Sequence, residues 1–169
     1  MPDGPGLELL RGEIDVDAPG AVLATSFEKE RAVLIADADR IIEVLGWLRD
    51  KPGQGYRFLS SLHVADYLPA EPRFGVHYEL LNRDRVERLR VKAMLGSQSP
   101  EIDSCVELFP TANFQEREAF DFFGVVFHGH PELTRILLPE DYVGFPQRRD
   151  FPVGGEPVTF TYSEGRYGA

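Results

Sequence analysis

The chain has 169 residues and a formal net charge of −10, from 18 basic and 28 acidic side chains. A surface with this excess of acidic groups repels phosphates, which argues against nucleic acids and anionic lipid headgroups as direct partners. No apolar run reaches the roughly 20 residues that a membrane-spanning helix requires, and the first residues lack a signal-peptide pattern. We expect a cytoplasmic chain that reaches a membrane only through a partner protein.

The single cysteine, Cys105, limits the redox chemistry of the chain. One thiol cannot form an internal disulfide, and an iron–sulfur cluster usually needs four thiolates. Free cysteines are most often buried, and the acidic residues around Cys105 disfavour the reactive thiolate. We expect a buried, unreactive thiol.

Residues 1–20 are rich in glycine and proline. They predict a loosely structured opening with at most a short helical turn around 7–11. Two apolar-rich segments follow at 22–27 and 31–35, separated by three charged residues. This arrangement is typical of a β-hairpin.

Apolar residues recur at helical spacing over 38–49, which predicts a helix with Asp37 as its N-cap. Three strands are expected after it, at 58–67, 74–81 and 89–95, because apolar and polar residues alternate in the last two. The order of helix and strands favours a mixed sheet packed on helices.

The third of these strands has a basic outer face made by Arg88, Arg90 and Lys92. We expect these side chains to lie opposite His77 and Glu79 across the hairpin, where opposite charges stabilise the pair by roughly 0.2–1 kcal/mol.

Residues 100–110 are expected to form a connector, and 111–123 a second long helix with Thr111 or Asn113 as its cap. Arg117 and Asp121 are four residues apart in this helix, so they can pair on one of its faces.

The character of the sequence changes after residue 128. Residues 129–169 show no helical or alternating period before 158–162. Prolines stand at 131, 139, 146, 152 and 157 and favour extended chain. This segment is nevertheless rich in large apolar residues, unlike a disordered tail. The sequence therefore predicts an α+β, two-layer domain over 1–128 and an extended C-terminal tail over 129–169 that packs on a partner.

Two groups of residues are candidates for chemistry. His128 and His130 share a face if they lie on a strand, but a metal site needs two further ligands. Ser61, His63 and Asp66 suggest a triad, yet Asp66 points to the opposite face of a strand. Phosphate-binding glycine loops are missing as well. We assign no catalytic, cofactor-binding or metal-binding residue to this chain.

The segment 116–152 mixes charged residues with large aromatic and aliphatic ones, a composition typical of a protein–protein interface. We predict that the following residues contact a partner: Glu116, Arg117, Glu118, Asp121, His130, Arg135, Tyr142, Phe145, Arg148, Arg149 and Asp150.

The same segment resembles a known family. The run 116–124 is similar to the Glu-Arg-Glu-x-x-Asp-x-Phe-Gly motif of the C subunit, the 30 kDa peripheral-arm subunit, of NADH-quinone oxidoreductase (respiratory complex I). The runs 129–133, 135–137, 139–146 and 148–152 continue the pattern. The resemblance extends over about 31–162.

One position departs from the family pattern. The chain has Thr134 where the family usually has a basic residue beside Arg135. This departure puts one polar contact of the family in doubt.

The resemblance implies a structural and assembly subunit of the hydrophilic arm of a proton-translocating enzyme, on the cytoplasmic side of the plasma membrane. Its partners would be the large quinone-site subunit (the D subunit), the B subunit and neighbouring iron–sulfur subunits. FMN and the iron–sulfur clusters would reside in those partners, with no cofactor on this chain. Three alternatives stay open: a related subunit of a membrane-bound hydrogenase or formate-hydrogen lyase, a standalone binding module, and a small metal-dependent enzyme built on His128 and His130.

Overall fold

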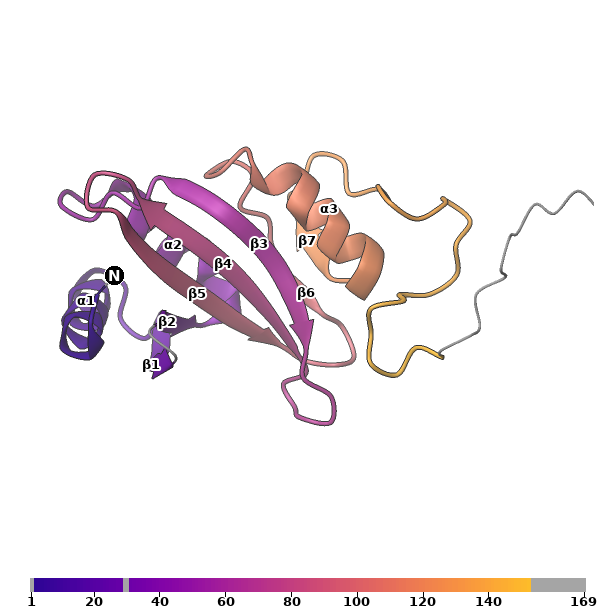
Figure 1. The fold of residues 1–169 in the computed structure, drawn as a ribbon, viewed down its shortest axis with the longest axis horizontal. Helices are drawn as coiled ribbons and strands as arrows, with labels where there is room; N and C mark the ends of the chain where they lie inside the picture. The colour runs from indigo at the N-terminus through magenta and orange to yellow at the C-terminus, as the bar shows by residue number, and fades with distance from the viewer. Residues whose placement is uncertain (1, 29–30, 153–169) are drawn as a thin grey trace, which may run out of the picture.

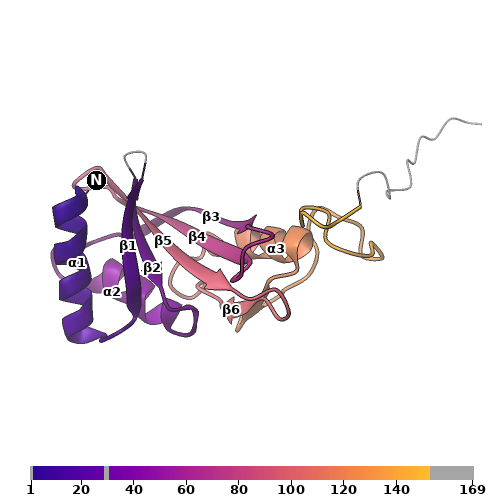
Figure 2. The same ribbon diagram turned by 90° about the horizontal axis from the view of Figure 1, so that it is seen from below.

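A computed structural model describes residues 2–28 and 31–152. Its centre is a five-stranded mixed sheet in the order β1-β2-β5-β4-β3. Strands β2 and β5 pair in parallel, and the other neighbours pair antiparallel. Helix α2 lies behind the sheet, and α1 lies beside β1 and β2 (Figure 1, Figure 2). The predicted α+β class, with a mixed sheet packed on helices, is confirmed.

The elements of the described chain follow in this order: α1 Gly4–Asp17, β1 Val22–Glu28, β2 Arg31–Ala36, a 3-10 turn Ala38–Arg40, α2 Ile41–Asp50, β3 Phe58–Asp66, β4 Phe74–Asn82, β5 Glu87–Leu95, β6 Glu101–Asp103, α3 Ala112–Phe123 and β7 Val126–His128. The predicted hairpin, the first long helix and the three strands after it all form within a few residues of their expected bounds. None of the helices in the described ranges is long and apolar enough to cross a membrane.

The prediction of a loose opening was wrong, because α1 has 14 residues. Asp3 caps it by accepting a hydrogen bond from the Gly6 amide at 2.8 Å. Proline lies in its first turn, where no intrahelical amide donor is needed. Leu7, Leu10 and Ile14 recur at helical spacing and are buried. Burial of this stripe against β1 and β2 outweighs the low helix propensity of the glycines.

Strands β2 and β5 bury alternate residues. Strand β5 buries Leu89, Val91, Ala93 and Leu95, and leaves its basic residues on the other face. Across the β4–β5 pair, Glu79 lies opposite Arg90 and His77 opposite Lys92, as expected. Arg90 forms an ion pair with Glu79. The predicted basic outer face is therefore confirmed.

The predicted helix caps are partly confirmed. Asp37 caps the 3-10 turn before α2 by accepting from the Asp39 amide at 3.1 Å. Thr111 stands at the N-cap position of α3 but makes no capping hydrogen bond. Its hydroxyl donates instead to the Leu59 carbonyl at 3.3 Å, which ties α3 to β3.

Two short strands were not predicted. Strands β6 and β7 pair in parallel, in a small second sheet. Each has three residues, too few for a visible alternation. They place the end of α3 next to the connector that precedes it.

Residues 129–152 contain no helix or strand and extend past α3 (Figure 1). The alternating segment at 158–162 lies outside the described residues. The division into a domain over 1–128 and a partner-binding tail over 129–169 stays a prediction.

Candidate functional site

The segment 116–152 folds back on its own helix α3, around Asp121. The carboxylate of Asp121 is fully buried and accepts hydrogen bonds from the amides of Ile136, Leu137 and Leu138 at 3.1, 2.8 and 2.9 Å. It also forms an ion pair with Arg135 at 2.7 Å. Burial opposes the ionisation of Asp121, but these four hydrogen bonds prevail and lower its pKa.

Arg135 fixes the next turn of the same segment. Its guanidinium donates to the Asp121 carbonyl at 3.0 Å and to the carbonyls of Tyr142 and Gly144 at 3.0 and 3.1 Å. It lies 5.6 Å from the ring centroid of Phe145. The planar fork of an arginine suits several acceptors at once. Residues 135–145 are thus held by one ion pair rather than by regular secondary structure.

Gly124 ends α3 in a left-handed conformation, with φ of 69°. A Cβ at this position would stand 2.5 Å from the ring of Phe145 and 2.8 Å from the guanidinium of Arg148. Arg148 donates to the Phe123 carbonyl at 2.7 Å and lies over the rings of Phe74 and Phe145, at 5.0 and 4.6 Å from their centroids. A glycine is therefore required both by φ and by close packing.

A second ion-pair cluster ties residues 149–150 to the β3–β4 connection. Arg73 binds Asp66 at 2.6 Å and Asp150 at 2.7 Å. Asp66 also accepts from the Arg149 amide at 2.8 Å, and the Arg149 side chain donates to the Leu68 carbonyl at 2.6 Å. The guanidinium of Arg73 holds the pKa of Asp66 well below its usual range. These contacts join the end of β3 and the start of β4 to residues 149–150, which lie about 80 residues farther along the sequence.

Sequence reasoning did not single out Arg73, and it considered Asp66 for chemistry only as a member of a rejected triad, although 58–62 with Asp66 and Tyr67 also resemble the central strand of the family. Arg73 has no neighbour in the sequence that marks it as an ion-pair centre. The β3–β4 hairpin brings Asp66 to it, and the packing of residues 149–150 on this hairpin brings Asp150.

Glu116, the first residue of the motif, lies on the buried side of α3 and is not exposed to solvent. It accepts from the Ser104 hydroxyl at 2.6 Å and from the Cys105 amide at 2.8 Å. Burial raises its pKa, against the effect of these two donors. Glu116 and Asp121 offer no surface to a partner, so the expectation of direct contact is corrected for them: their carboxylates bind groups of this chain.

Arg117 of the motif and His130 of the loop that follows connect α3 to this loop. Arg117 donates to the Thr134 carbonyl at 3.1 Å and to its hydroxyl at 3.0 Å, so the predicted Arg117–Asp121 pair does not form. His130 Nε2 lies 3.1 Å from the Asn113 carbonyl. Where the resemblance leads us to expect a basic side chain, this chain has Thr134, and its hydroxyl accepts a hydrogen bond from Arg117.

Other members of the predicted interface lie at the surface. Glu118, Arg149 and Asp150 are exposed, and Tyr142, Phe145 and Arg148 are half-buried. Large apolar side chains are exposed nearby, including Val143 at 89%, Phe114 at 64% and Leu137 at 61%. Exposed apolar groups beside ordered polar ones are typical of a contact surface. The role of these residues in binding a partner stays a prediction.

The groups that suggested chemistry are engaged elsewhere. Ser61 Oγ is 3.4 Å from His63 Nδ1, while Asp66 binds Arg73 on the far side of the strand. His128 pairs with Glu101 at 2.8 Å and does not converge with His130. Within residues 2–28 and 31–152 no group of three or more histidine, cysteine, aspartate or glutamate side chains could hold a metal ion.

Cys105 is buried, as expected. Burial raises the pKa of its thiol, and the nearby Glu116 carboxylate acts in the same direction. Both effects oppose formation of the reactive thiolate.

Solved structures share this fold. The trypsin-resistant fragment (1–134) of Nqo5 is 27% identical, with a TM-score of 0.64, and the match covers 75% of this chain and 98% of the fragment. A chain of the membrane-bound sulfane sulfur reductase, an archaeal respiratory membrane complex, matches with a TM-score of 0.69 at 24% identity, over 86% of this chain and 85% of that one. The second likeness concerns the fold alone.

Curated relatives extend over most of the chain. The NADH-quinone oxidoreductase C subunit of Roseiflexus castenholzii is 44% identical over 148 residues, which are 88% of this chain and 85% of the relative. The corresponding protein of Roseiflexus sp. strain RS-1 is 40% identical over 160 residues, 95% of this chain and 90% of the relative. The family model of the respiratory-chain NADH dehydrogenase 30 Kd subunit matches residues 34–157. The chain belongs to the family of the 30 Kd subunit of respiratory-chain NADH dehydrogenase.

Proposed function

We propose that this chain is a non-catalytic structural and assembly subunit in the peripheral arm of a proton-translocating NADH-quinone oxidoreductase. Electrons would pass from NADH to quinone through FMN and iron–sulfur clusters that partner subunits carry. The complex would lie on the cytoplasmic side of the plasma membrane, which this chain reaches only through its partners.

One observation carries the proposal. The segment 135–152 has no helix or strand, yet two ion-pair clusters hold it in one arrangement with Leu137 and Val143 exposed. Ordering an irregular segment costs conformational entropy, and ordering before binding reduces the cost of association. This favours a preformed contact surface. The partner we assign to it is the large quinone-site subunit, with the iron–sulfur subunits nearby.

The contact surface is tested by placing a charge on it. Val143→Asp puts a carboxylate on the most exposed apolar side chain of the segment, whose 89% exposure leaves few contacts to break. The matched control is Val16→Asp, a similarly exposed valine on α1. In cells that produce a tagged chain, Val143→Asp should reduce the amount of the quinone-site subunit that co-purifies, and Val16→Asp should not. Equal recovery of that partner with both variants would contradict the proposal.

A related subunit of a complex with another electron donor is the second candidate. A chain of the sulfane sulfur reductase, an archaeal respiratory membrane complex, has the same fold, so the fold by itself does not distinguish between electron donors. The two candidates differ in their partners. Co-purified flavin- and NAD-binding subunits would support NADH as donor, and a nickel-ligating large subunit would support a hydrogenase.

A further inference from the structure

One face of the five-stranded sheet carries no helix of the described chain. The core side chains of the strands point toward α2, and the opposite face of β3, β4 and β5 is turned to the viewer in Figure 1. Open faces of antiparallel sheets normally carry mixed charges in contact with water. The composition of this one departs from that expectation.

The open face is basic on a chain that is strongly acidic. Arg31 of β2 and Arg88, Arg90 and Lys92 of β5 project from it, and Glu79 of β4 is the carboxylate that β3, β4 and β5 contribute. In the β1–β2 register, Glu28 of β1 is opposite Arg31. Glu79 is already paired with Arg90. Within the described residues, Arg31 and Arg88 have no ion-pair partner. A concentration of positive charge on a molecule of net charge −10 selects an acidic partner and repels other cations.

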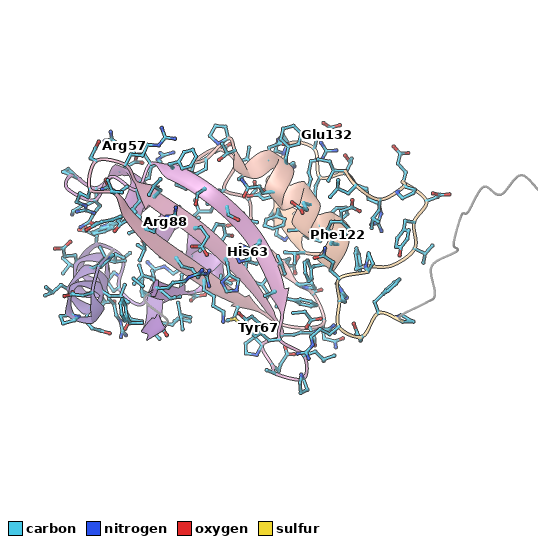
Figure 3. All side chains as sticks on the ribbon, in the orientation of Figure 1. Arg57, His63, Tyr67, Arg88, Phe122 and Glu132 are labelled. Atoms are coloured by element: carbon cyan, nitrogen blue, oxygen red, sulfur yellow. The ribbon has the colours of Figure 1, made fainter. Side chains whose placement is uncertain are left out.

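The same face is hollowed. A cavity of about 380 Å³ opens on it, lined by the basic and polar residues Arg31, Ser60, His63, Arg88 and Arg90, by Glu79, and by apolar residues of β2, β4 and β5. Figure 3 shows Arg88 near the start of β5 and His63 on β3, both on the side turned to the viewer. Four strands contribute to the lining, so the hollow crosses the sheet rather than following one strand.

One buried ring nitrogen on this side of the sheet has no hydrogen-bond partner in the described structure. The imidazole of His77 is 4% exposed and stacks on His63 with 4.9 Å between ring centroids. Its Nε2 meets the Tyr67 hydroxyl at 3.1 Å, whereas Nδ1 is buried with no hydrogen-bond partner in the described structure. A native protein rarely leaves such an atom unpaired.

The size of the basic region decides between ligands. The four cations lie on the neighbouring strands β2 and β5, and Arg88 and Lys92 are four residues apart along β5, or about 13 Å at roughly 3.3 Å per residue. A phosphate-sized anion would contact one or two of these cations. An extended peptide of four or five residues covers the distance at roughly 3.3 Å per residue, with carboxylates on one side meeting the arginines.

We infer that the open face of β2, β5, β4 and β3 is a docking surface for an acidic polypeptide segment of a partner protein, separate from the surface at 135–152. This inference rests on the proposed function, because it requires that the chain works within an assembly. The acidic segment lies along β5, with its carboxylates on Arg31, Arg88 and Lys92.

Zero-length carbodiimide cross-linking of the purified complex tests the inference without any substitution. This reagent joins a lysine amine to a carboxylate only where the two are in contact. Lys92 should be linked to an aspartate or glutamate of another protein of the complex, as mass spectrometry would identify. Lys51 is the matched control, since it is exposed and pairs with Asp17 of its own chain. Absence of an intermolecular link at Lys92, or a link from Lys92 to a carboxylate of its own C-terminal segment, would overturn the inference.

A pair of charge reversals gives an independent measurement. Arg88→Glu changes the open face, and Arg57→Glu makes the same change at an exposed arginine away from its centre (Figure 3). The Arg88→Glu chain should be lost from the complex at an ionic strength that retains both wild type and Arg57→Glu. Equal retention of all three would overturn the inference while leaving the proposed function intact. A wild-type chain that joins no assembly at all would overturn both.

Discussion

Asp121 and Arg135 lie 14 residues apart and form an ion pair with 2.7 Å between Oδ1 and Nη1, in the interior of the chain. Asp121 is the acceptor for three consecutive amides of the loop, and Arg135 is the donor to two carbonyls farther along it. This pair gives an irregular segment a single conformation. The charged motif of α3 therefore acts first within the chain.

Replacement of Asp121 should release this loop. Asp121→Asn keeps the size of the side chain but leaves the Arg135 guanidinium without its counter-charge, which costs about 3–5 kcal/mol of unfolding free energy for a buried pair. Urea denaturation measures the loss, and hydrogen exchange at the amides of 136–138 should become faster.

The control for this substitution is Glu118→Gln, on the exposed side of the same helix. It should change the unfolding free energy by less than about 0.5 kcal/mol. A similar loss in both variants would show that charge on α3, rather than the Asp121–Arg135 pair, stabilises the chain.

Gly124→Ala should be more harmful than Gly129→Ala, although both glycines have positive φ, 69° and 79°. The left-handed conformation costs an alanine about 1–2 kcal/mol at either position. At Gly124 the new Cβ would also stand 2.5 Å from the Phe145 ring, whereas at Gly129 it would meet nothing within 4 Å. We expect a total cost of about 2–5 kcal/mol at Gly124 because Phe145 has to move. Equal urea midpoints for the two variants would mean that the Phe145 ring moves away from the new Cβ without loss of unfolding free energy.

Asp66 and Asp150 share Arg73 but should differ in their contribution to stability. The side chain of Asp66 is 2% exposed and that of Asp150 is 53% exposed. Asp66→Asn should cost about 3–5 kcal/mol, as for a buried pair. Asp150→Asn should cost less than about 1 kcal/mol, because water screens an exposed pair. Thermal unfolding of the two variants measures the difference, and a larger effect of Asp150→Asn would contradict this assignment.

Burial of His77 should make stability depend on pH. Burial, with the neighbouring His63, Arg90 and Lys92, lowers the pKa of His77 to about 3, against about 6.5 in an unfolded chain. The unfolded chain therefore takes up a proton first as the pH falls. The stabilisation is fully present above about pH 6.5 and is lost progressively between about 6.5 and about 3, in total on the order of 5 kcal/mol.

The variant His77→Gln tests this pH dependence, since it removes the titrating group. The slope of the urea midpoint between about pH 6.5 and 4 should become flatter in His77→Gln than in wild type. Ser61→Ala changes a non-titrating residue of the same face and should keep the wild-type slope. An unchanged slope in His77→Gln would assign the pH dependence to other groups.

Sequence periodicity predicted the sheet well and the ends of the chain poorly. Strand β5 was visible because Leu89 and Val91 alternate with arginines, and packing preserves that pattern. Helix α1 had a comparable signal in Leu7, Leu10 and Ile14, but its glycines and prolines argued more strongly for a loop. Its stability comes from burial against the sheet, which local propensity does not contain.

The candidate site could be located from the sequence but its contacts could not be predicted. Composition marked the segment 116–152, and helical spacing then suggested that Asp121 pairs with Arg117. In the structure Asp121 pairs with Arg135, because three loop amides and a guanidinium satisfy a buried carboxylate better than one surface arginine does. The partner of Asp66 likewise depends on the fold, since Asp150 reaches Arg73 only after residues 149–150 have packed on the β3–β4 connection.

Purification of the tagged chain from its native membranes, followed by mass spectrometry of the co-purified proteins, tests the central claim most directly. A structural component of an NADH-quinone oxidoreductase should be recovered with the large quinone-site subunit, the iron–sulfur subunits and the proteins that bind FMN and NAD. Recovery of the chain alone, or with a nickel-ligating large subunit and no flavin-binding partner, would contradict the claim.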